Sequence, residues 1–224
     1  MARRSAGLLL CQIAALFVVA VLLVRPDLSM AQAPARYDVT GFRDARFGMT
    51  EQEVRATARD SFGAKDDEMT VTVNPTDGTT KLIVHVTMLE PGLGEGRVEY
   101  LFGYRSHRLV QVNVVWGLDT NPPRNNSAMI AGAARLQRYF LGFTWASRSV
   151  RAGVPIDDGA VLVFSGEDRK SGAVTVAIEG VRYDIGPNGV VRYYPERLSP
   201  PRLVVSYIAD RNESDVRSVV RGAF

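Results

Sequence analysis

The side chains that most often carry catalytic chemistry are sparse in this sequence of 224 residues. Two histidines occur: His85 lies in a stretch of alternating apolar residues, and His107 lies in a predicted turn that also holds two arginines. A general base or a metal ligand needs a carboxylate or a second histidine within reach, and neither histidine has one nearby in sequence. We therefore expect structural or solvent-facing roles for both, and we predict no catalytic residue, no metal site and no cofactor.

Three short motifs resemble ligand sites but lack their defining residues. The loop at residues 92–96 is rich in glycine, but a phosphate-binding loop needs a following helix, and a strand is predicted here instead. The acidic groups at residues 66–68 and 157–158 lack the alternating oxygen ligands of a calcium loop. We expect a hairpin turn at the first motif and solvated loop ends at the other two.

Aromatic residues and arginines in the second half of the chain are the best candidates for a binding surface. Tyrosine, tryptophan and arginine are enriched at the centres of protein interfaces. The candidate interaction surface consists of Trp145, Tyr183, Arg192, Tyr193, Tyr194 and Arg197. The alternative is that these aromatic side chains fill an irregular core, as large aromatic residues usually do.

The N-terminus has the three-part order of a secretory signal. Arg3 and Arg4 precede an apolar run over residues 8–24, and small residues ending at Ala31 offer a cleavage site. We expect residues 1–31 to be a cleaved signal peptide. The alternative is an uncleaved anchor in the inner membrane, because the apolar run is near the lower length limit for crossing a bilayer. In both cases the basic end stays inside and the rest of the chain is exported.

The composition narrows the compartment and the partners. Cys11 is the sole cysteine and lies in the apolar run, so the mature chain has no thiol for a disulfide or for catalysis. Few lysines among many arginines indicate a GC-rich bacterial genome, and hence a periplasmic protein. Residues 1–31 hold three arginines and one aspartate, so the remainder is nearly neutral. A near-neutral surface argues against nucleic-acid binding.

The elements that must position these residues follow in a regular order. After a lead-in at residues 32–47, Thr50 and Glu53 form a capping box that predicts a helix ending at Gly63. Period-two alternation predicts four strands between residues 69 and 116. A break rich in proline and asparagine at residues 117–125 precedes a second helix and further strands. The predicted fold class is α+β, with two consecutive helix-plus-antiparallel-sheet units at residues 48–118 and 126–224.

The segment FGMTEQEV at residues 47–54, followed by a strand meander, resembles the helix entry of two related groups. One is the small outer-membrane lipoprotein of the barrel-assembly machinery, and the other is the β-lactamase-inhibitor-protein fold, which stacks two such units in tandem. The chain lacks a lipid-carrying cysteine after the signal and the disulfides usual in the inhibitors. The resemblance implies an exported protein-binding module.

These observations favour a non-catalytic periplasmic protein that binds another protein or a component of the cell envelope. Contact with the membrane is expected only if the N-terminal helix is retained. The alternative is a periplasmic enzyme that uses carboxylates and arginines on an envelope substrate such as a glycan. A pair of carboxylates in one pocket would favour the enzyme.

Overall fold

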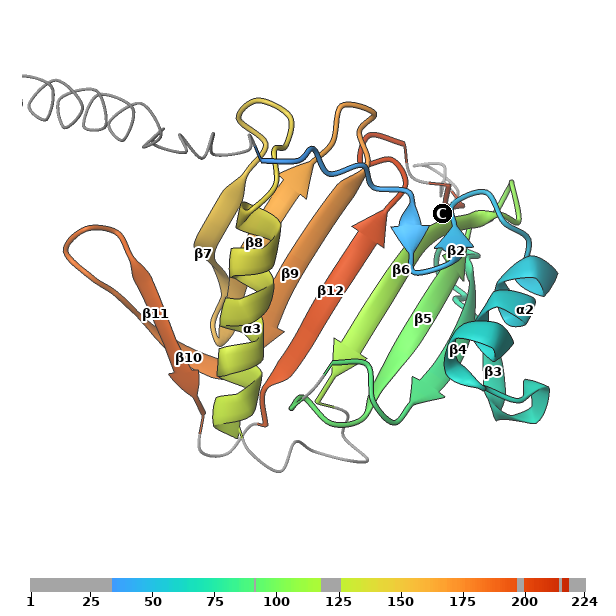
Figure 1. Cartoon of the computed structure of the whole chain (residues 1–224), viewed down its shortest axis with the longest axis horizontal. Helices are drawn as coiled ribbons and strands as arrows, with labels where there is room; N and C mark the ends of the chain where they lie inside the picture. The colour runs from blue at the N-terminus through green and yellow to red at the C-terminus, as the bar shows by residue number, and fades with distance from the viewer. Residues whose placement is uncertain (1–33, 91, 118–125, 197–199, 214, 218–224) are drawn as a thin grey trace, which may run out of the picture. The chain divides into compact units, whose positions relative to one another are not determined.

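An eight-stranded antiparallel sheet forms the centre of the fold, with the strand order β3-β4-β5-β6-β12-β9-β8-β7 (Figure 1). The computed structural model describes residues 34–90, 92–117, 126–196, 200–213 and 215–217. The predicted signal peptide, residues 118–125 of the predicted break at 117–125, and Arg197 lie outside these residues. All described residues belong to one compact unit that begins at Pro34.

The first part of the chain places a helix and four strands in the order that the sequence predicts. A short hairpin comes first, and the remaining elements follow it directly. Their bounds are β1 Gly41–Phe42, β2 Ala45–Arg46, α2 Glu51–Phe62, a 3-10 turn at Asp66–Glu68, β3 Met69–Val73, β4 Thr80–Val86, β5 Gly96–Phe102 and β6 Leu109–Trp116. The β1–β2 hairpin falls in the predicted irregular lead-in, because strands of two residues are too short to give an alternating pattern.

The helix α2 begins at the predicted capping box. The Glu53 amide donates to Thr50 Oγ1 at 3.3 Å, and the Thr50 amide donates to Glu53 Oε2 at 2.7 Å. Gly63 ends the helix in the left-handed conformation, with φ 66°, which glycine adopts at low cost. Val54 and Ala58 are fully buried on the face that packs on the sheet.

The second part of the chain contributes the other helix and the remaining strands. Their bounds are α3 Asn126–Leu141, β7 Arg151–Asp157, β8 Ala160–Glu167, β9 Ala173–Glu179, β10 Val181–Ile185, β11 Val191–Pro195 and β12 Arg202–Ile208. The strand β7 was not predicted, because Gly153 and Pro155 interrupt its pattern. The strands β10 and β11 form a separate two-stranded hairpin.

The strand β12 joins the two parts by pairing with β6 on one side and β9 on the other. Val205 of β12 lies opposite Val114 and Val176, and all three side chains are buried. The broad α+β class is therefore confirmed. The joining of all the long strands into one sheet is decided by this β6–β12 pairing, which no local pattern in the sequence indicates.

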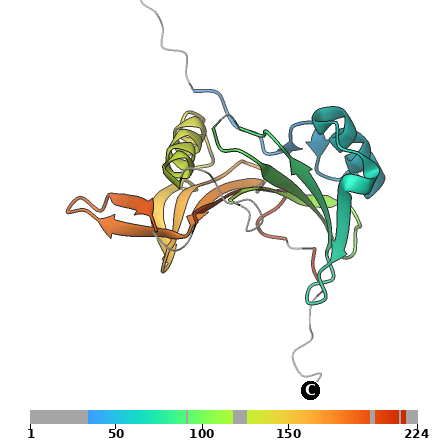
Figure 2. The same ribbon diagram turned by 90° about the horizontal axis from the view of Figure 1, so that it is seen from below.

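Both helices lie on the same face of the sheet (Figure 2). α2 contacts β4, and α3 contacts β8, β9 and β12. The apolar residues that alternate along the strands point to this side and form the core with Phe140 of α3. The opposite face carries a transverse row of directly paired residues, Glu99, Asn113, Ser206 and Thr175. We call it the helix-free face.

Candidate functional site

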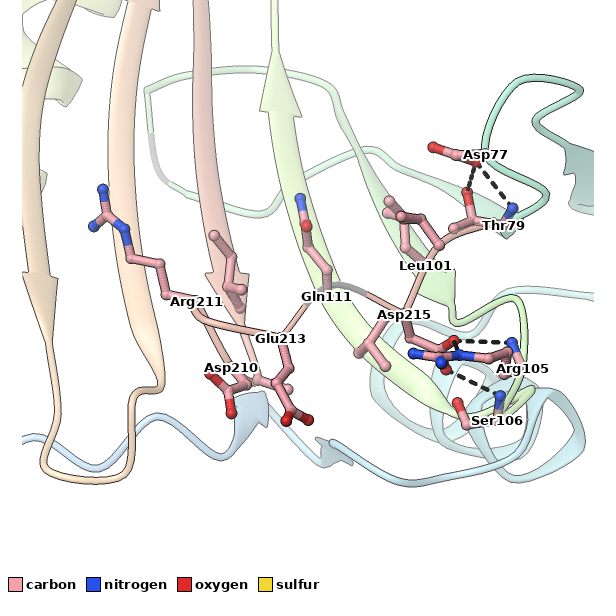
Figure 3. A pocket seen from close by; sticks show the side chains of 14 residues that line it. Asp77, Thr79, Leu101, Arg105, Ser106, Gln111, Asp210, Arg211, Glu213 and Asp215 are labelled. Atoms are coloured by element: carbon pink, nitrogen blue, oxygen red, sulfur yellow. Dashed lines mark hydrogen bonds and ion pairs between the residues drawn. The ribbon is translucent and has the colours of Figure 1, made fainter. Parts of the chain in front are cut away.

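A cavity of about 690 Å³ lies beside the ends of β5, β6 and β12 (Figure 3). The chain leaves β12 at Ile208 and then crosses the turns between neighbouring strands. The amide of Tyr104 donates to the Asp215 carbonyl at 2.8 Å, and the amide of Arg217 donates to the Asp77 carbonyl at 2.7 Å. One wall of the cavity is therefore formed after β12, by Ala209, Asp210, Arg211, Glu213, Asp215 and Val216, and the strand ends and turns form the rest.

The Asp215 carboxylate fastens this wall to the β5–β6 turn. It accepts hydrogen bonds from the amides of Arg105 and Ser106, each at 2.9 Å, and the Arg105 Nε lies 3.4 Å away. Hydrogen bonds from the Ser106 side chain and from the backbone of Arg105 and Ser106 lower the pKa of Asp215 to about 2. The Asp215 carboxylate is thus ionised at neutral pH. It accepts hydrogen bonds from backbone amides of the turn, as an N-cap carboxylate does at the start of a helix.

The lining of the cavity combines apolar and charged groups. The apolar contribution comes from Leu101, Val110, Ile208, Ala209 and Val216. The charged contribution comes from Asp77, Arg105, Asp210, Arg211, Glu213 and Asp215. Apolar surface with a few polar groups at the side is the usual makeup of a site for an organic ligand, and the volume suits a small molecule or one or two side chains.

The Asp77 carboxylate stabilises the turn between β3 and β4. Its Oδ1 accepts from the Thr79 amide at 2.9 Å and from the Thr79 hydroxyl at 2.7 Å, which closes the β3–β4 turn. Hydrogen bonds from the Thr79 backbone and hydroxyl lower the pKa of Asp77. The carboxylates of Asp77 and Asp215 are therefore bases of low strength, and neither is suited to donate a proton near neutral pH.

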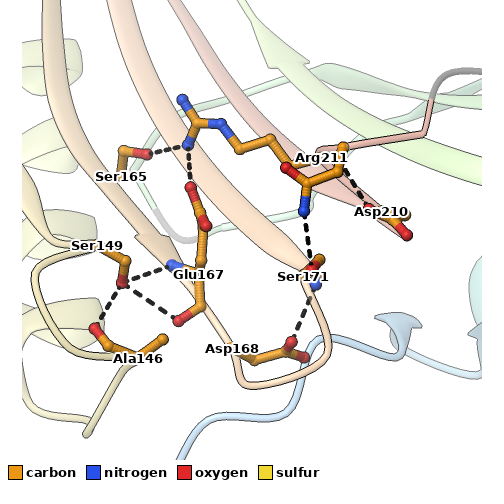
Figure 4. A network of polar contacts seen from close by, with 10 residues as sticks. Ala146, Ser149, Ser165, Glu167, Asp168, Ser171, Asp210 and Arg211 are labelled. Carbon is orange, nitrogen blue, oxygen red and sulfur yellow. Dashed lines mark hydrogen bonds and ion pairs between the residues drawn. The ribbon is translucent and has the colours of Figure 1, made fainter.

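A polar network anchors the other end of the wall to β8 and the β8–β9 loop (Figure 4). Arg211 donates to Ser165 Oγ at 3.1 Å and lies 3.2 Å from a carboxylate oxygen of Glu167. The Arg211 amide donates to the Ser171 carbonyl at 2.9 Å. Within that loop the buried Asp168 accepts from three backbone amides, which belong to Val39, Lys170 and Gly172. The wall is thus fixed at both of its ends.

A second polar network extends from the cavity across the helix-free face. Gln111, which lines the cavity, donates to Asn113 at 2.8 Å, and Asn113 donates to Glu99 at 3.4 Å. Glu99 is 4% exposed and lies 2.7 Å from Arg97 and 3.2 Å from Lys81. Burial raises the pKa of Glu99, but the two cations together outweigh burial, so the pKa is lowered overall. The buried charge is therefore compensated.

The predicted interaction residues lie elsewhere, and none of those described lines the cavity. Trp145 packs beside the core, stacked on Tyr37 with ring centroids 4.9 Å apart, and its indole N–H donates to the Phe140 carbonyl at 2.8 Å. Its position matches the core alternative rather than an exposed anchor.

The β10–β11 hairpin brings together four of the other predicted residues. Tyr183 and Tyr193 are directly paired and pack against the core from one face of the hairpin. Burial raises the pKa of Tyr193. Arg192 and Tyr194 lie on the other, exposed face. The hairpin therefore presents one arginine and one tyrosine of the predicted set to solvent.

The two histidines and the glycine-rich loop do not line the cavity. His85 is exposed on the helix-free face of β4, and His107 lies in the β5–β6 turn. Gly92 and Gly94 adopt positive φ in the loop between β4 and β5. Within the described ranges, no group of three or more histidine, cysteine or acidic residues is placed to hold a metal ion. No helix in those ranges is long and apolar enough to cross a membrane.

The sequence did not point to the cavity, because its wall has no periodic pattern. The segment ADRNESD at residues 209–215 is polar and follows the last strand, which is typical of a loop. Its two aspartates, Asp210 and Asp215, are of the residue type that binds backbone amides in turns, and this is the one signal that the segment carries.

Comparisons with protein-family models, with curated proteins and with solved structures found no match to this chain. The function must therefore be argued from the residues of the site.

Proposed function

We propose that the protein is an exported, non-catalytic binding protein of the bacterial envelope, and that the cavity beside β12 holds a segment of another envelope protein. The single observation that carries this proposal is the makeup of the cavity. One space of about 690 Å³ is lined both by the apolar residues Leu101, Val110 and Ile208 and by the acidic residues Asp210 and Glu213. This combination fits an apolar side chain with a basic residue beside it.

The anchoring of the wall by hydrogen bonds at both ends supports binding to a preformed site. Asp215 holds one end of this wall and Arg211 holds the other, each through hydrogen bonds to different strands or turns. A preformed site avoids the entropic cost of ordering a loop when the partner binds. The partner segment is then expected to gain order without a large change in this protein.

The test is to capture the partner with and without the acidic side of the cavity. The doubly substituted protein D210K/E213K reverses the charge that would attract a basic residue. The matched control is D60K, which makes the same kind of change at an exposed position of α2. Cross-linking in intact cells should recover a partner with the wild type and with D60K, and at least tenfold less of it with D210K/E213K. Equal recovery from all three proteins would refute the cavity as the binding site.

The enzyme alternative has one observation in its favour, which is the presence of several carboxylates in this cavity. Glycoside hydrolysis needs one carboxyl with a raised pKa as the acid and a second carboxylate opposite. Asp77 and Asp215 have lowered pKa values, which excludes them as the acid and leaves Asp210 or Glu213 for that role. Release of reducing sugars from envelope glycans by the wild type, and its loss in D210N or E213Q, would favour the enzyme.

We also propose that the fold consists of two helix-plus-sheet units. The strand order supports this, because from the centre of the sheet outward the order is β6, β5, β4, β3 on one side and β12, β9, β8, β7 on the other, so both halves run from late strands to early ones. Each half also has its own helix on the same face.

Export is tested by mass spectrometry of the N-terminus. We expect Gln32 to be the first residue, and an intact Met1 would favour the anchor.

A further inference from the structure

The two edges of the sheet differ in how well they are protected against pairing with another strand. At one edge, β7 contains Gly153 and Pro155, and its register with β8 shifts between Pro155 and Asp157. A proline and a bulge are devices that keep an edge strand from recruiting a partner. The hairpin strand β11 also contacts β7.

At the other edge, β3 has none of these devices (Figure 1). Its sequence is MTVTV, without proline, glycine or charge, and residues 70–73 are all exposed. The strand β4 pairs with one side of β3, so the N–H and C=O groups of alternate residues point away from the sheet. In the described part of the chain, the backbone hydrogen bond of β3 beyond the regular ladder is the one from the Met69 amide to the Asp66 carbonyl at the start of the strand.

We propose that β3 pairs with β3 of a second copy of this chain, antiparallel, about a two-fold axis that passes beside Val71. In this register Val71 faces Val71 of the second copy, Met69 faces Val73, and Thr70 faces Thr72. Apolar residues therefore meet apolar residues, and hydroxyls meet hydroxyls. The two-fold axis pairs residues 69, 71 and 73 with the same three residues of the second copy. It likewise pairs residues 70 and 72 with residues 72 and 70. Backbone hydrogen bonds can thus form in this register whichever set points outward.

The same register continues both faces of the sheet across the two copies. Met69 and Val71 lie opposite Val84 and Leu82, which are buried on the helix-covered side. Directly opposed residues share a face, so the apolar side chains of both copies would lie on that side. The exposed fractions of Val71 and Val73 are 40% and 63%, and pairing would lower both.

The flanking charges permit this pairing. The acidic residues Asp66, Asp67 and Glu68 precede β3 and no acid follows it until Asp77. In the antiparallel register Glu68 faces Asn74 of the second copy, and the acidic groups of the two copies lie at opposite ends of the paired strands. A parallel arrangement would instead bring the acidic groups together, which costs free energy.

The association stops at two copies. A two-fold interface uses the same strand of each copy, so both β3 edges are consumed. The free edges of the joined sheet are then the two protected β7 strands. Because the interface is one short strand, it is smaller than the roughly 1,200 Å² of a standard stable interface, and a reversible dimer is expected at about 0.1 mM protein.

Disulfide trapping tests the register directly. Across an antiparallel pair the Cα atoms are about 4.5–5.5 Å apart, which is within the range that a disulfide spans. In a C11S background, V71C should give a covalent dimer under mild oxidation. The matched control is V154C on β7, because Val154 is 39% exposed and Val71 is 40% exposed. We expect V154C to stay monomeric; equal yields from the two variants would overturn the proposal.

Sedimentation equilibrium of the exported protein tests the same proposal without a cross-link. The wild type should show a concentration-dependent rise toward twice the monomer mass. V71K places two like charges at the two-fold axis and should weaken association at least tenfold, whereas V154K should not change it. A wild type that is monomeric up to about 1 mM, or a folded V71K variant that dimerises as well as the wild type, would overturn the proposal.

Discussion

Asp215 is expected to contribute stability that depends on pH in a defined way. Its carboxylate accepts two amide hydrogen bonds from the β5–β6 turn, and its pKa falls from 3.8 to about 2. That lowering corresponds to about 2 kcal/mol at most. The side chain is 17% exposed, and solvent screening reduces the expected contribution to about 1 kcal/mol.

The sign follows from the direction of the shift. A carboxyl whose pKa is lowered by folding binds its proton more readily in the unfolded state, so its contribution is complete above the ordinary pKa. The contribution then falls as the pH drops from about 5 toward 2, and about half of it is left at pH 3.

The assay is urea unfolding of the wild type, D215N and D60N, followed by circular dichroism at pH 7 and pH 3. D215N should be less stable than the wild type by about 1 kcal/mol at pH 7, and the difference should halve at pH 3. D60N, on the exposed side of α2, should match the wild type at both pH values. A D215N deficit that is the same at both pH values would refute the reasoning.

A second way to perturb the same contact is G103A. A methyl group at Gly103 would collide with the Asp215 carboxylate, so the wall of the cavity would have to move. We expect G103A to lose as much stability as D215N or more, and to lose partner binding along with it. Retention of full stability by G103A would show that the contact is not formed.

Three further predictions concern other buried groups. D168A removes the acceptor of three backbone amides at a site that is 5% exposed, so we expect a loss of about 3 kcal/mol or more in urea unfolding. Y193A should lower the free energy of unfolding by about 2–4 kcal/mol, because Tyr193 packs against the core. Y194A, on the exposed face, should change it by less than about 0.5 kcal/mol. Equal losses from the two variants would contradict the assignment of the two faces. E99Q should be less stable than the wild type at pH 7, and the deficit should shrink as the pH falls below the ordinary pKa of glutamate, because the pKa of Glu99 is lowered in the folded protein. A deficit that grows in acid would contradict this sign.

Local structure followed from the sequence alone wherever a periodic pattern or a cap was complete. Thr50, Glu53 and Gly63 specify the start and end of α2 through hydrogen bonds within a few residues. Alternation of large apolar residues such as Leu82, Val84 and Val86 identified the strands and their buried face, because successive side chains of a strand point to opposite sides.

The way these elements combine depends on contacts between residues that are far apart in the sequence. The joining of both parts into one sheet depends on the pairing of β6 with β12, which are far apart in sequence and carry apolar patterns that would suit other partners equally. The cavity depends on Asp215 reaching the amides of Arg105 and Ser106, a contact across 110 residues. A single polar segment does not encode which amides it will meet, so this site could be found only in three dimensions.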